Sequence, residues 1–380
     1  LAKEKTGGSA ETIILVATSG DTGKAALEGF KDVPGIRIIV FYPHGGVSKV
    51  QELQMVTTGG MNTHVVAVEG NFDDCQTAVK EVFADEFLKK DLAARGFELS
   101  SANSINWGRL LPQIVYYFWA YLYLLRQKTI IPGEKINFVV PTGNFGNILA
   151  GWYARCMGLP VHKLICASNQ NKVLTDFFHT GVYDSNRDFI QTSSPSMDIL
   201  ISSNLERFLF GVTGHDAGKI KEWMEDLKEK GLFEVGYETR EKIAEVIAAG
   251  FADEGETFEA IRDIFDDKGY LIDTHTAVGY KVYRKYVAGT GDPTRTVIIS
   301  TASPFKFCGS VLEALGHQVF PPGNDEHAML HRLSSLSGVP VHFSLQALEQ
   351  RPILHRAISG KTEIKNQILR ILFEGDNQRQ

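Results

Sequence analysis

Residues 138–153 have the sequence FVVPTGNFGNILAGWY. An apolar run is followed by a turn with two glycines and then by a second apolar segment, which predicts a buried strand, a tight turn and a helix. Such a turn directs several backbone N–H groups to one point beside the positive end of the helix dipole, so it is suited to bind an anion such as a phosphate. An ordinary strand-to-helix turn has the same pattern, so this stretch alone leaves both interpretations open.

Two common nucleotide-binding patterns do not match this sequence. Gly143 and Gly146 form Gly-x-x-Gly, which lacks the first glycine pair of the dinucleotide fingerprint, and no Gly-Lys-Ser/Thr follows. Residues 18–25 also fail as a P-loop, because the leading glycine is replaced by Thr18 and the closing Ser/Thr by Ala25. These failures disfavour a nucleotide-binding Rossmann protein and indicate another phosphorylated cofactor, such as pyridoxal phosphate.

The composition indicates a globular protein with a substantial core. The chain has 380 residues, of which 43% are hydrophobic and 22% charged, and this length suits two domains. The net charge of −6 disfavours nucleic acid as a partner. The four cysteines are scattered without a Cys-x-x-Cys pair, as in cytosolic proteins. The longest apolar run, residues 110–125, is interrupted at Pro112 and is too short to span a membrane, so we expect a cytoplasmic protein.

Strand-like and helix-like segments alternate along the chain, which predicts an α/β protein with parallel strands. We expect a small domain over residues 1–100, a large domain over 101–320 with an insertion near 171–210, and a C-terminal tail over 321–380. The predicted strands are 12–17, 37–42, 64–68, 138–141, 163–167 and 296–300. The predicted helices are 23–30, 47–58, 73–95, 110–125, 217–229, 239–249, 254–267 and 364–373.

Three further polar motifs stand at predicted helix starts or strand ends. Residues 18–23, TSGDTG, bring small hydroxyl groups and two glycines to a helix start, which suits an anion or a carboxylate. Residues 103–109, NSINWGR, offer an amide, a hydroxyl and a guanidinium, and arginine suits bidentate phosphate binding. Residues 301–307, TASPFKF, follow a strand, at the end where open α/β sheets bind ligands. Each motif is also compatible with a helix cap or a plain turn.

Two polar clusters, SPSMD at residues 194–198 and DTHTA at residues 273–277, either line a site or satisfy backbone groups in loops. His275 is the most site-like histidine, although a single histidine is more often structural. His327 and His331 share a helical face that permits metal binding, but no third ligand is evident. We therefore predict a surface helix there and no metal site.

Together these motifs resemble the threonine synthases, pyridoxal-phosphate enzymes that convert O-phosphohomoserine and water to threonine and phosphate. The resemblance covers nearly the whole chain and favours the larger subgroup found in many bacteria and in fungi. It rests on six motifs in a fixed order: ATSGDTG at 17–23, NSxNxxR at 103–109, GNFGN at 143–147, SPSMD at 194–198, DxHTA at 273–277 and TASP at 301–304.

The resemblance implies a fold-type-II architecture, with two doubly wound α/β domains and pyridoxal phosphate in the cleft between them. The implied cofactor-binding residues are Asp21, Gly143, Asn144, Phe145, Gly146, Asn147 and Thr301. Within this set, Thr301 would bond the pyridine nitrogen and Asp21 would lie near the phenolic oxygen. The implied substrate-binding residues are Ser19, Thr22, Asn103, Ser104 and Arg109, the last three serving the substrate phosphate. The implied reaction eliminates phosphate from the γ carbon and adds water at the β carbon, in a monomer or a homodimer.

The family's Schiff-base lysine stands in a Pro-Thr-x-x-Phe-Lys-Asp motif upstream of the Ser-Gly-Asp-Thr-Gly loop. Only Lys3 and Lys5 precede that loop here, without the motif, and Lys31 lies downstream of it. Because the chain starts at Leu1, we predict an N-terminal truncation that removes this lysine and leaves the fragment inactive by itself. Two alternatives remain: a related phospho-lyase that releases 2-oxobutyrate, and a non-catalytic binding protein without the lysine.

Overall fold

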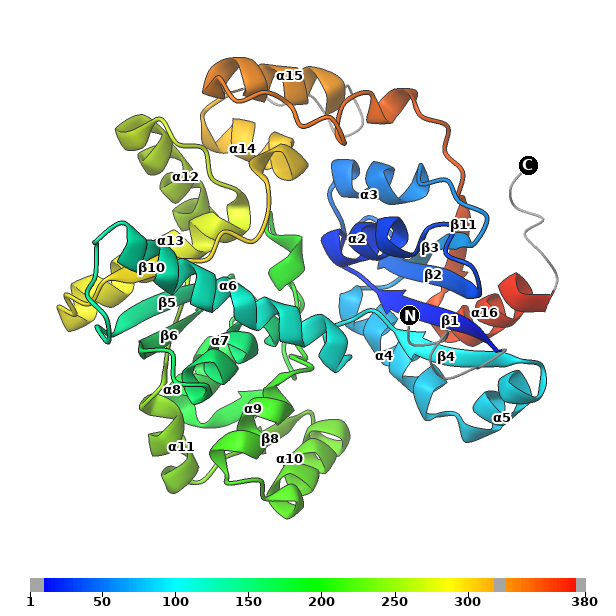
Figure 1. Ribbon diagram of the computed structural model, residues 1–380, viewed down its shortest axis with the longest axis horizontal. Coiled ribbons are helices and arrows are strands. Elements are labelled where there is room, and N and C mark those ends of the chain that lie inside the picture. Colours follow the sequence, from blue (N-terminus) through cyan, green and yellow to red (C-terminus); the bar gives the residue numbers. More distant parts are fainter. Residues whose placement is uncertain (1–9, 318–325, 374–380) are drawn as a thin grey trace. The chain divides into compact units, whose positions relative to one another are not determined.

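The structure, a computed structural model, describes residues 10–317 and 326–373 and divides into two compact units (Figure 1). Within the described residues, unit 1 comprises 10–106, 326–331 and 340–373. Unit 2 comprises 107–317 and 332–339. Each unit has its own sheet and its own hydrophobic core.

Unit 1 is built on a five-stranded parallel sheet with the order β11-β3-β2-β1-β4. Its strands are β1 (Glu11–Ala17), β2 (Ile36–Pro43), β3 (Thr63–Glu69), β4 (Phe97–Ser101) and β11 (Ala357–Gly360). Its helices are α2 (Asp21–Phe30), α3 (Lys49–Val56), α4 (Phe72–Ala84), α5 (Glu86–Ala94) and α16 (Ile364–Phe373), with the 3-10 turns η3 (Leu348–Gln350) and η4 (Lys361–Glu363). The central strands are buried along most of their length because α2 and α3 cover one face of the sheet and α4 covers the other (Figure 1).

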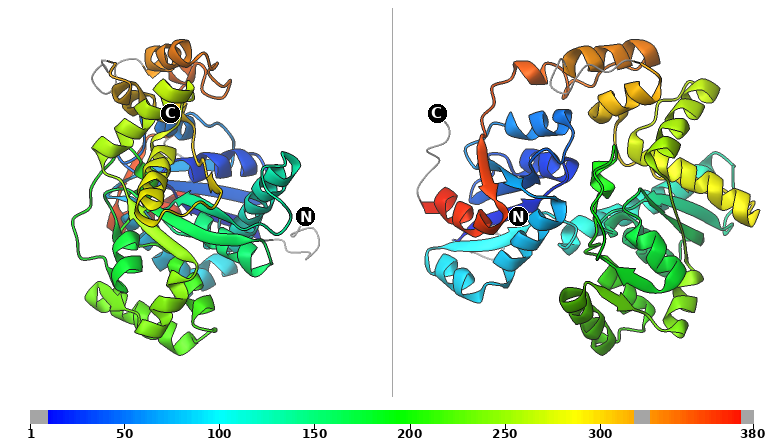
Figure 2. Two further views of the ribbon diagram at one scale, coloured as in Figure 1. Left: turned by 90° about the vertical axis from the view of Figure 1, so that its left-hand side faces the viewer. Right: turned by 180° about the vertical axis from the view of Figure 1, so that it is seen from behind.

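The strand β11 shows how the end of the chain joins unit 1. Its four residues pair in parallel with β3, from Ala357 opposite Val66 to Gly360 opposite Glu69. Figure 2 shows this late strand, in red-orange, at the edge of the blue strands. The tail that the sequence separates as residues 321–380 therefore supplies an edge strand to a sheet whose first strand, β1, begins at Glu11.

Two of the predicted helices are wrong in their extent. The helix expected over 73–95 is interrupted at Asp85, whose carboxylate accepts a hydrogen bond from the Leu88 N–H at 2.9 Å and so begins α5. The helix expected over 239–249 ends at Ala244, and the residues after it form the strand β9 (Ile247–Phe251). The sequence IAAGF has no alternating pattern, and its backbone becomes a strand because β6 offers a hydrogen-bonding partner.

Unit 2 is built on a four-stranded parallel sheet with the order β10-β5-β6-β9. Its strands are β5 (Ile136–Pro141), β6 (Val161–Ser168), β9 and β10 (Thr296–Ile298), with a small antiparallel pair, β7 (Val182–Asp184) and β8 (Leu232–Glu234). Its helices include α6 (Trp107–Arg126), α7 (Gly146–Cys156), α8 (Val173–Thr180), α9 (Leu205–Val212), α10 (Ala217–Lys230), α11 (Tyr237–Ala244), α12 (Glu254–Lys268), α13 (Thr274–Thr290) and α14 (Cys308–Ala314), with the 3-10 turns η1 (Pro195–Met197) and η2 (Pro304–Phe307). The helix α15 (Glu326–Ser337) crosses the division between the two units.

Alternating side chains of β5 divide the core of unit 2 into two layers. Phe138 and Val140 pack with residues of α6 and α7, whereas Val139 packs with Val278 and Val282 of α13. The sheet is therefore covered on both faces. Residues 273–277, for which the sequence left open a site lining or a loop, cap and begin a 17-residue helix. Among the described residues, no helix is both long enough and apolar enough to cross a bilayer.

A half-buried carboxylate joins three segments at one end of this sheet. Asp292 accepts hydrogen bonds from the side chains of Asn137 at 2.9 Å and Tyr286 at 2.7 Å and from the Thr294 N–H at 2.9 Å. Burial by itself raises the pKa of Asp292, but the hydrogen bonds from Thr294, Tyr286 and Asn137 hold it below its usual value. The ionised carboxylate therefore contributes to the stability of unit 2.

Candidate active site

The turn between β5 and α7 is held with its carbonyl groups pointing to one side. We call residues 142–147 the phosphate loop. Ser202 donates its hydroxyl to the Gly143 carbonyl at 2.6 Å, and Asn204 donates both its backbone N–H and its side-chain amide to the Asn144 carbonyl at 3.1 and 3.0 Å. The C=O and N–H of a trans peptide point in opposite directions, so the N–H groups of Asn144 and Phe145 are directed away from Ser202 and Asn204. The loop thus has the arrangement of an anion-binding turn.

Two side chains of the phosphate loop point into the protein. Phe145 has a left-handed backbone, with φ 66°, and its ring is buried against Phe178 and Phe208 at centroid distances of 5.9 and 5.5 Å. Asn147 accepts a hydrogen bond from the Tyr117 hydroxyl at 2.8 Å. The packing holds Phe145 in a backbone conformation that is costly for a residue with a side chain. These two residues therefore present backbone groups, rather than side chains, to a ligand.

Gly143 is required by a close approach between two backbone segments. A Cβ atom at this position would lie 2.5 Å from the Ser196 carbonyl oxygen and 2.9 Å from Ile199 Cδ1. The phosphate loop therefore packs directly against the segment that carries the SPSMD motif. The sequence predicts the two glycines but not the segment that fills the space of the missing side chain.

The SPSMD segment is anchored by a buried acid. Asp198 accepts hydrogen bonds from the side chains of Asn169 at 2.7 Å and Asn171 at 3.0 Å, and from the N–H and the hydroxyl of Thr192, both at 2.8 Å. Burial raises the pKa of Asp198, and the hydrogen bonds from Thr192 and Asn169 oppose that effect without cancelling it. Asp198 thereby fixes the segment against the carboxyl end of β6, next to the phosphate loop.

Thr301 lies at the same edge of the unit 2 sheet as the phosphate loop, but it follows a different strand, β10. It follows β10, which pairs in parallel with β5, and Ile299 continues this contact by donating its N–H to the Val139 carbonyl at 2.9 Å. Neighbouring parallel strands end at one edge, so Thr301 and the phosphate loop both lie at the carboxyl edge of the unit 2 sheet. Thr301 is exposed there.

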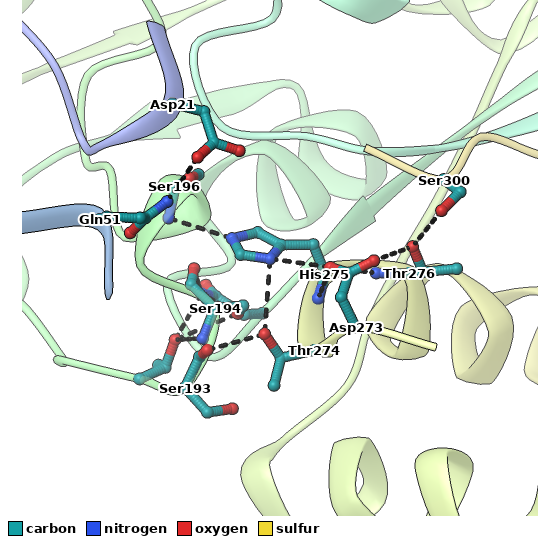
Figure 3. Close-up of polar contacts among 12 residues, drawn as sticks. Asp21, Gln51, Ser193, Ser194, Ser196, Asp273, Thr274, His275, Thr276 and Ser300 are labelled. Carbon is teal, nitrogen blue, oxygen red and sulfur yellow. Dashed lines mark hydrogen bonds and ion pairs between the residues drawn. The ribbon is translucent and has the colours of Figure 1, made fainter. Parts of the chain in front are cut away.

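Unit 1 contains a second turn stabilised by hydrogen bonds, residues 18–23, at the carboxyl end of β1. The Thr18 hydroxyl accepts hydrogen bonds from the N–H groups of Gly20 at 3.0 Å and Gly23 at 2.8 Å. The Asp21 carboxylate accepts one from the Gln51 side chain at 2.9 Å (Figure 3). Gln51 also fills the space where a Cβ on Gly20 would lie, 2.4 Å from its Cδ atom. Asp21 is therefore oriented from α3.

The remaining predicted residues lie in both units. Ser19 and Thr22 are half-buried in the turn and the first turn of α2. Asn103 follows β4, the neighbour of β1, and its amide is bonded to both the N–H and the C=O of Ala17, at 3.0 and 2.5 Å. Ser104 follows it in unit 1, whereas Arg109 is an exposed residue of α6 in unit 2.

Sequence reasoning missed three residues that build these turns: Ser202, Asn204 and Gln51, which hold the backbone or side chains described above. His275, which the sequence analysis singles out, accepts a hydrogen bond from the Ser196 N–H. A signal exists for Gln51, since Ser48 and Gln51 have the spacing of a capping box and form one. The polar run ISSN at 201–204 before α9 is the corresponding signal for Ser202 and Asn204.

A lysine and a pair of histidines named in the sequence analysis lie outside these turns. Lys31, whose place downstream of the Ser-Gly-Asp-Thr-Gly loop argues against it as the Schiff-base lysine, is the exposed residue directly after α2. His327 and His331 contact each other on α15 through their Nε2 atoms, 2.7 Å apart. In the part of the chain that the structure describes, no group of three or more His, Cys, Asp or Glu side chains is placed to hold a metal ion.

Comparison with known proteins identifies the family. The family described as "Pyridoxal-phosphate dependent enzyme" matches residues 1–302, and that described as "Threonine synthase, C-terminal" matches residues 276–353. The crystal structure of PLP-bound threonine synthase from Brucella melitensis resembles this chain with a TM-score of 0.77 and 37% identity, over 97% of this chain and 72% of that one. The chain belongs to the threonine synthase family. The predicted fold-type-II architecture and the pyridoxal phosphate dependence of the family are thereby confirmed.

Curated threonine synthase relatives are longer than this chain. Threonine synthase from Pseudomonas aeruginosa is 42% identical over 304 residues, which are 80% of this chain and 62% of that protein. Threonine synthase-like 1 from Pongo abelii is 43% identical over 339 residues, which are 87% of this chain and 45% of that protein. The chain spans about half the length of the latter.

The phosphate loop fits the phosphate of the family's cofactor. Ser202 and Asn204 turn its carbonyl oxygens, which would repel an anion, away from the N–H groups of Asn144 and Phe145. The missing side chain of Gly143 allows the loop to pack against the SPSMD segment, and the N-terminus of α7 adds the positive end of its dipole.

Proposed function

We propose that the protein converts O-phospho-L-homoserine and water to L-threonine and phosphate, as a pyridoxal-phosphate-dependent lyase of threonine biosynthesis. The observation that carries this proposal is the phosphate loop of a threonine synthase family member, with its carbonyl groups tied back by Ser202 and Asn204. The similarity to named threonine synthases supports the choice of substrate.

In this proposal the backbone N–H groups of residues 143–147 bind the cofactor phosphate, and the Asn144 side chain, whose oxygen accepts the Gly146 N–H at 2.9 Å in this structure, turns away to release that N–H. The Thr301 hydroxyl bonds the pyridine nitrogen, and the Asp21 carboxylate lies near the phenolic oxygen, in the orientation that Gln51 gives it. When bound, the cofactor withdraws electrons from the reacting carbon atoms of the substrate. The chain's own groups orient the cofactor and balance its charge.

The substrate would be bound by hydroxyl and guanidinium groups. We propose that Ser19 and Thr22 contact its amino-acid part, because the turn at 18–23 presents small hydroxyl groups at a helix start. We assign Ser104 and Arg109 to its phosphate, for which the arginine fork supplies two parallel donors. Asn103 acts indirectly, because its amide is hydrogen-bonded to the backbone of Ala17, directly before the turn at 18–23, and so holds that turn in place.

The test is an assay of the natural protein that contains this chain, loaded with pyridoxal phosphate and supplied with O-phosphohomoserine. We expect equal amounts of threonine and phosphate. Release of phosphate with 2-oxobutyrate alone would replace the synthase by the phospho-lyase, and cofactor binding without any turnover would favour the non-catalytic binding protein. Gly289→Ala, near the end of α13 and away from the phosphate loop, is purified and assayed in parallel as the control for effects of protein preparation.

We further propose that the protein is cytoplasmic, that it is a monomer or a homodimer, and that it binds a small-molecule substrate. The four cysteines are free, and Cys75, Cys166 and Cys308 are buried, which supports a reducing compartment. Light scattering coupled to size exclusion distinguishes the two assembly states, and a larger mass would contradict both.

A further inference from the structure

We propose that His275 is a positioning residue for the phosphate loop, acting through Ser196 as a neutral imidazole with its proton on Nδ1. The inference rests on the proposed role of the loop in binding the cofactor phosphate. Figure 3 shows the imidazole between the Asp273 carboxylate and the backbone nitrogen of Ser196. None of the roles proposed above uses this histidine.

The surroundings of His275 determine its tautomer. His275 Nδ1 lies 3.1 Å from Asp273 Oδ1, and both side chains are almost fully buried. The carboxylate also accepts hydrogen bonds from the backbone N–H of His275 at 2.9 Å and from the N–H and hydroxyl groups of Thr276. An ionised carboxylate can only accept, so the imidazole proton lies on Nδ1 and Nε2 keeps its lone pair.

The lone pair on His275 Nε2 accepts a hydrogen bond from the backbone of Ser196. The N–H of Ser196 points at His275 Nε2, with the two nitrogens 3.2 Å apart. A backbone N–H that is buried without an acceptor is costly, so the imidazole fixes the orientation of this peptide.

Ser196 in turn packs against the phosphate loop. The Ser196 carbonyl is the nearest atom to the place where Gly143 lacks a side chain, 2.5 Å from a Cβ built there. A second hydrogen bond, from the Thr274 hydroxyl to the Ser193 carbonyl at 2.8 Å, ties the same segment to the start of α13. The first turn of α13 therefore holds both ends of residues 193–196, and this segment supports the loop.

A purely structural histidine would behave differently. The His275 ring also packs against Phe307 at a centroid distance of 4.8 Å, and loss of this contact would lower stability for every ligand state alike. A positioning role instead affects the part of the cofactor affinity that depends on the phosphate. The two roles are separated by comparing a ligand with and without its phosphate.

The experiment uses the 380-residue chain and titrates it with pyridoxamine 5′-phosphate and with pyridoxamine, which form no Schiff base with surface lysines. His275→Asn keeps an amide donor for Asp273 but is too short to reach the Ser196 N–H. His275→Gln reaches that N–H with its carbonyl oxygen. His179→Leu is the control, an exposed histidine of α8 in the same unit.

The preference is the ratio of the two dissociation constants, pyridoxamine over pyridoxamine 5′-phosphate. We expect His275→Asn to lower this ratio about tenfold, as for the loss of one buried hydrogen bond. We expect His275→Gln to stay within about threefold of the wild type. The control should leave the preference unchanged. Equal preference in wild type and His275→Asn overturns the inference. No preference for the phosphate in the wild type overturns the proposed role of the loop instead.

A measurement on the wild type needs no folded variant. Two-bond proton–nitrogen correlation spectra of the chain labelled with ¹⁵N-histidine give the tautomer of each ring. We expect His275 with a protonated Nδ1 and an Nε2 that accepts a hydrogen bond. A ring protonated on Nε2 would overturn the inference, because that nitrogen could no longer accept from Ser196.

Discussion

Replacing Gly143 with alanine tests the packing that supports the phosphate loop. The new Cβ atom would lie 2.5 Å from the Ser196 carbonyl oxygen, so the two must separate by at least 0.5 Å to reach the 3.0 Å below which real Cβ contacts essentially never occur. The obstacle is a backbone atom that cannot rotate away. We therefore expect the upper part of the usual cost of overpacking, about 2–3 kcal/mol. Because the Ser196 segment is held by Asp198 and His275, the phosphate loop is the part that moves.

The assay is thermal unfolding followed by calorimetry, together with titration of pyridoxamine 5′-phosphate. For a unit of this size the expected loss corresponds to a fall of roughly 4–12 °C in the melting temperature of unit 2. Gly289→Ala is the matched control, because its Cβ meets no atom within 4 Å in α13, and alanine there should stabilise by up to about 1 kcal/mol. Wild-type melting and affinity in Gly143→Ala would refute the reasoning, since a loop free to shift without cost is not held by its neighbours.

Three further substitutions follow from particular contacts. Asn103→Ala removes both hydrogen bonds to the Ala17 backbone and should lower the unfolding free energy of unit 1 by about 1–3 kcal/mol in urea; an unchanged midpoint would contradict this role. Ser202→Ala frees the Gly143 carbonyl and should weaken binding of pyridoxamine 5′-phosphate about three- to tenfold but leave pyridoxamine unaffected, whereas equal losses for both ligands would count against a phosphate effect. Asp292 has a lowered pKa in the folded state, so its stabilisation is present above the unfolded value of about 4 and is lost as the pH falls below it. Urea melts should therefore show a larger loss between about pH 6 and about pH 3 in the wild type than in Asp292→Asn, and parallel losses would refute this.

Local sequence patterns predict those strands, turns and helices whose apolar spacing and glycines stand in adjacent residues. The apolar run at 138–141 and the glycines at 143 and 146 predict β5, the phosphate loop and α7 in order, and the structure confirms them. The strand β9 escapes such reasoning because its sequence IAAGF is neither alternating nor rich in strand-forming side chains. Its backbone groups are satisfied only when β6, some eighty residues earlier, lies beside it.

The sequence by itself determined that this protein has parallel α/β units and a glycine turn suited to a phosphate, because strand, turn and helix signals are carried by adjacent residues. The tertiary structure alone decided how that turn is held, with the Gly143 and Asn144 carbonyl groups bonded to other segments. Ser202, Asn204, Ser196 and His275 come from segments fifty to one hundred and thirty residues away, and only folding brings their donors and acceptors to the loop. The glycine at 143 is visible in the sequence, whereas the carbonyl that requires it is not.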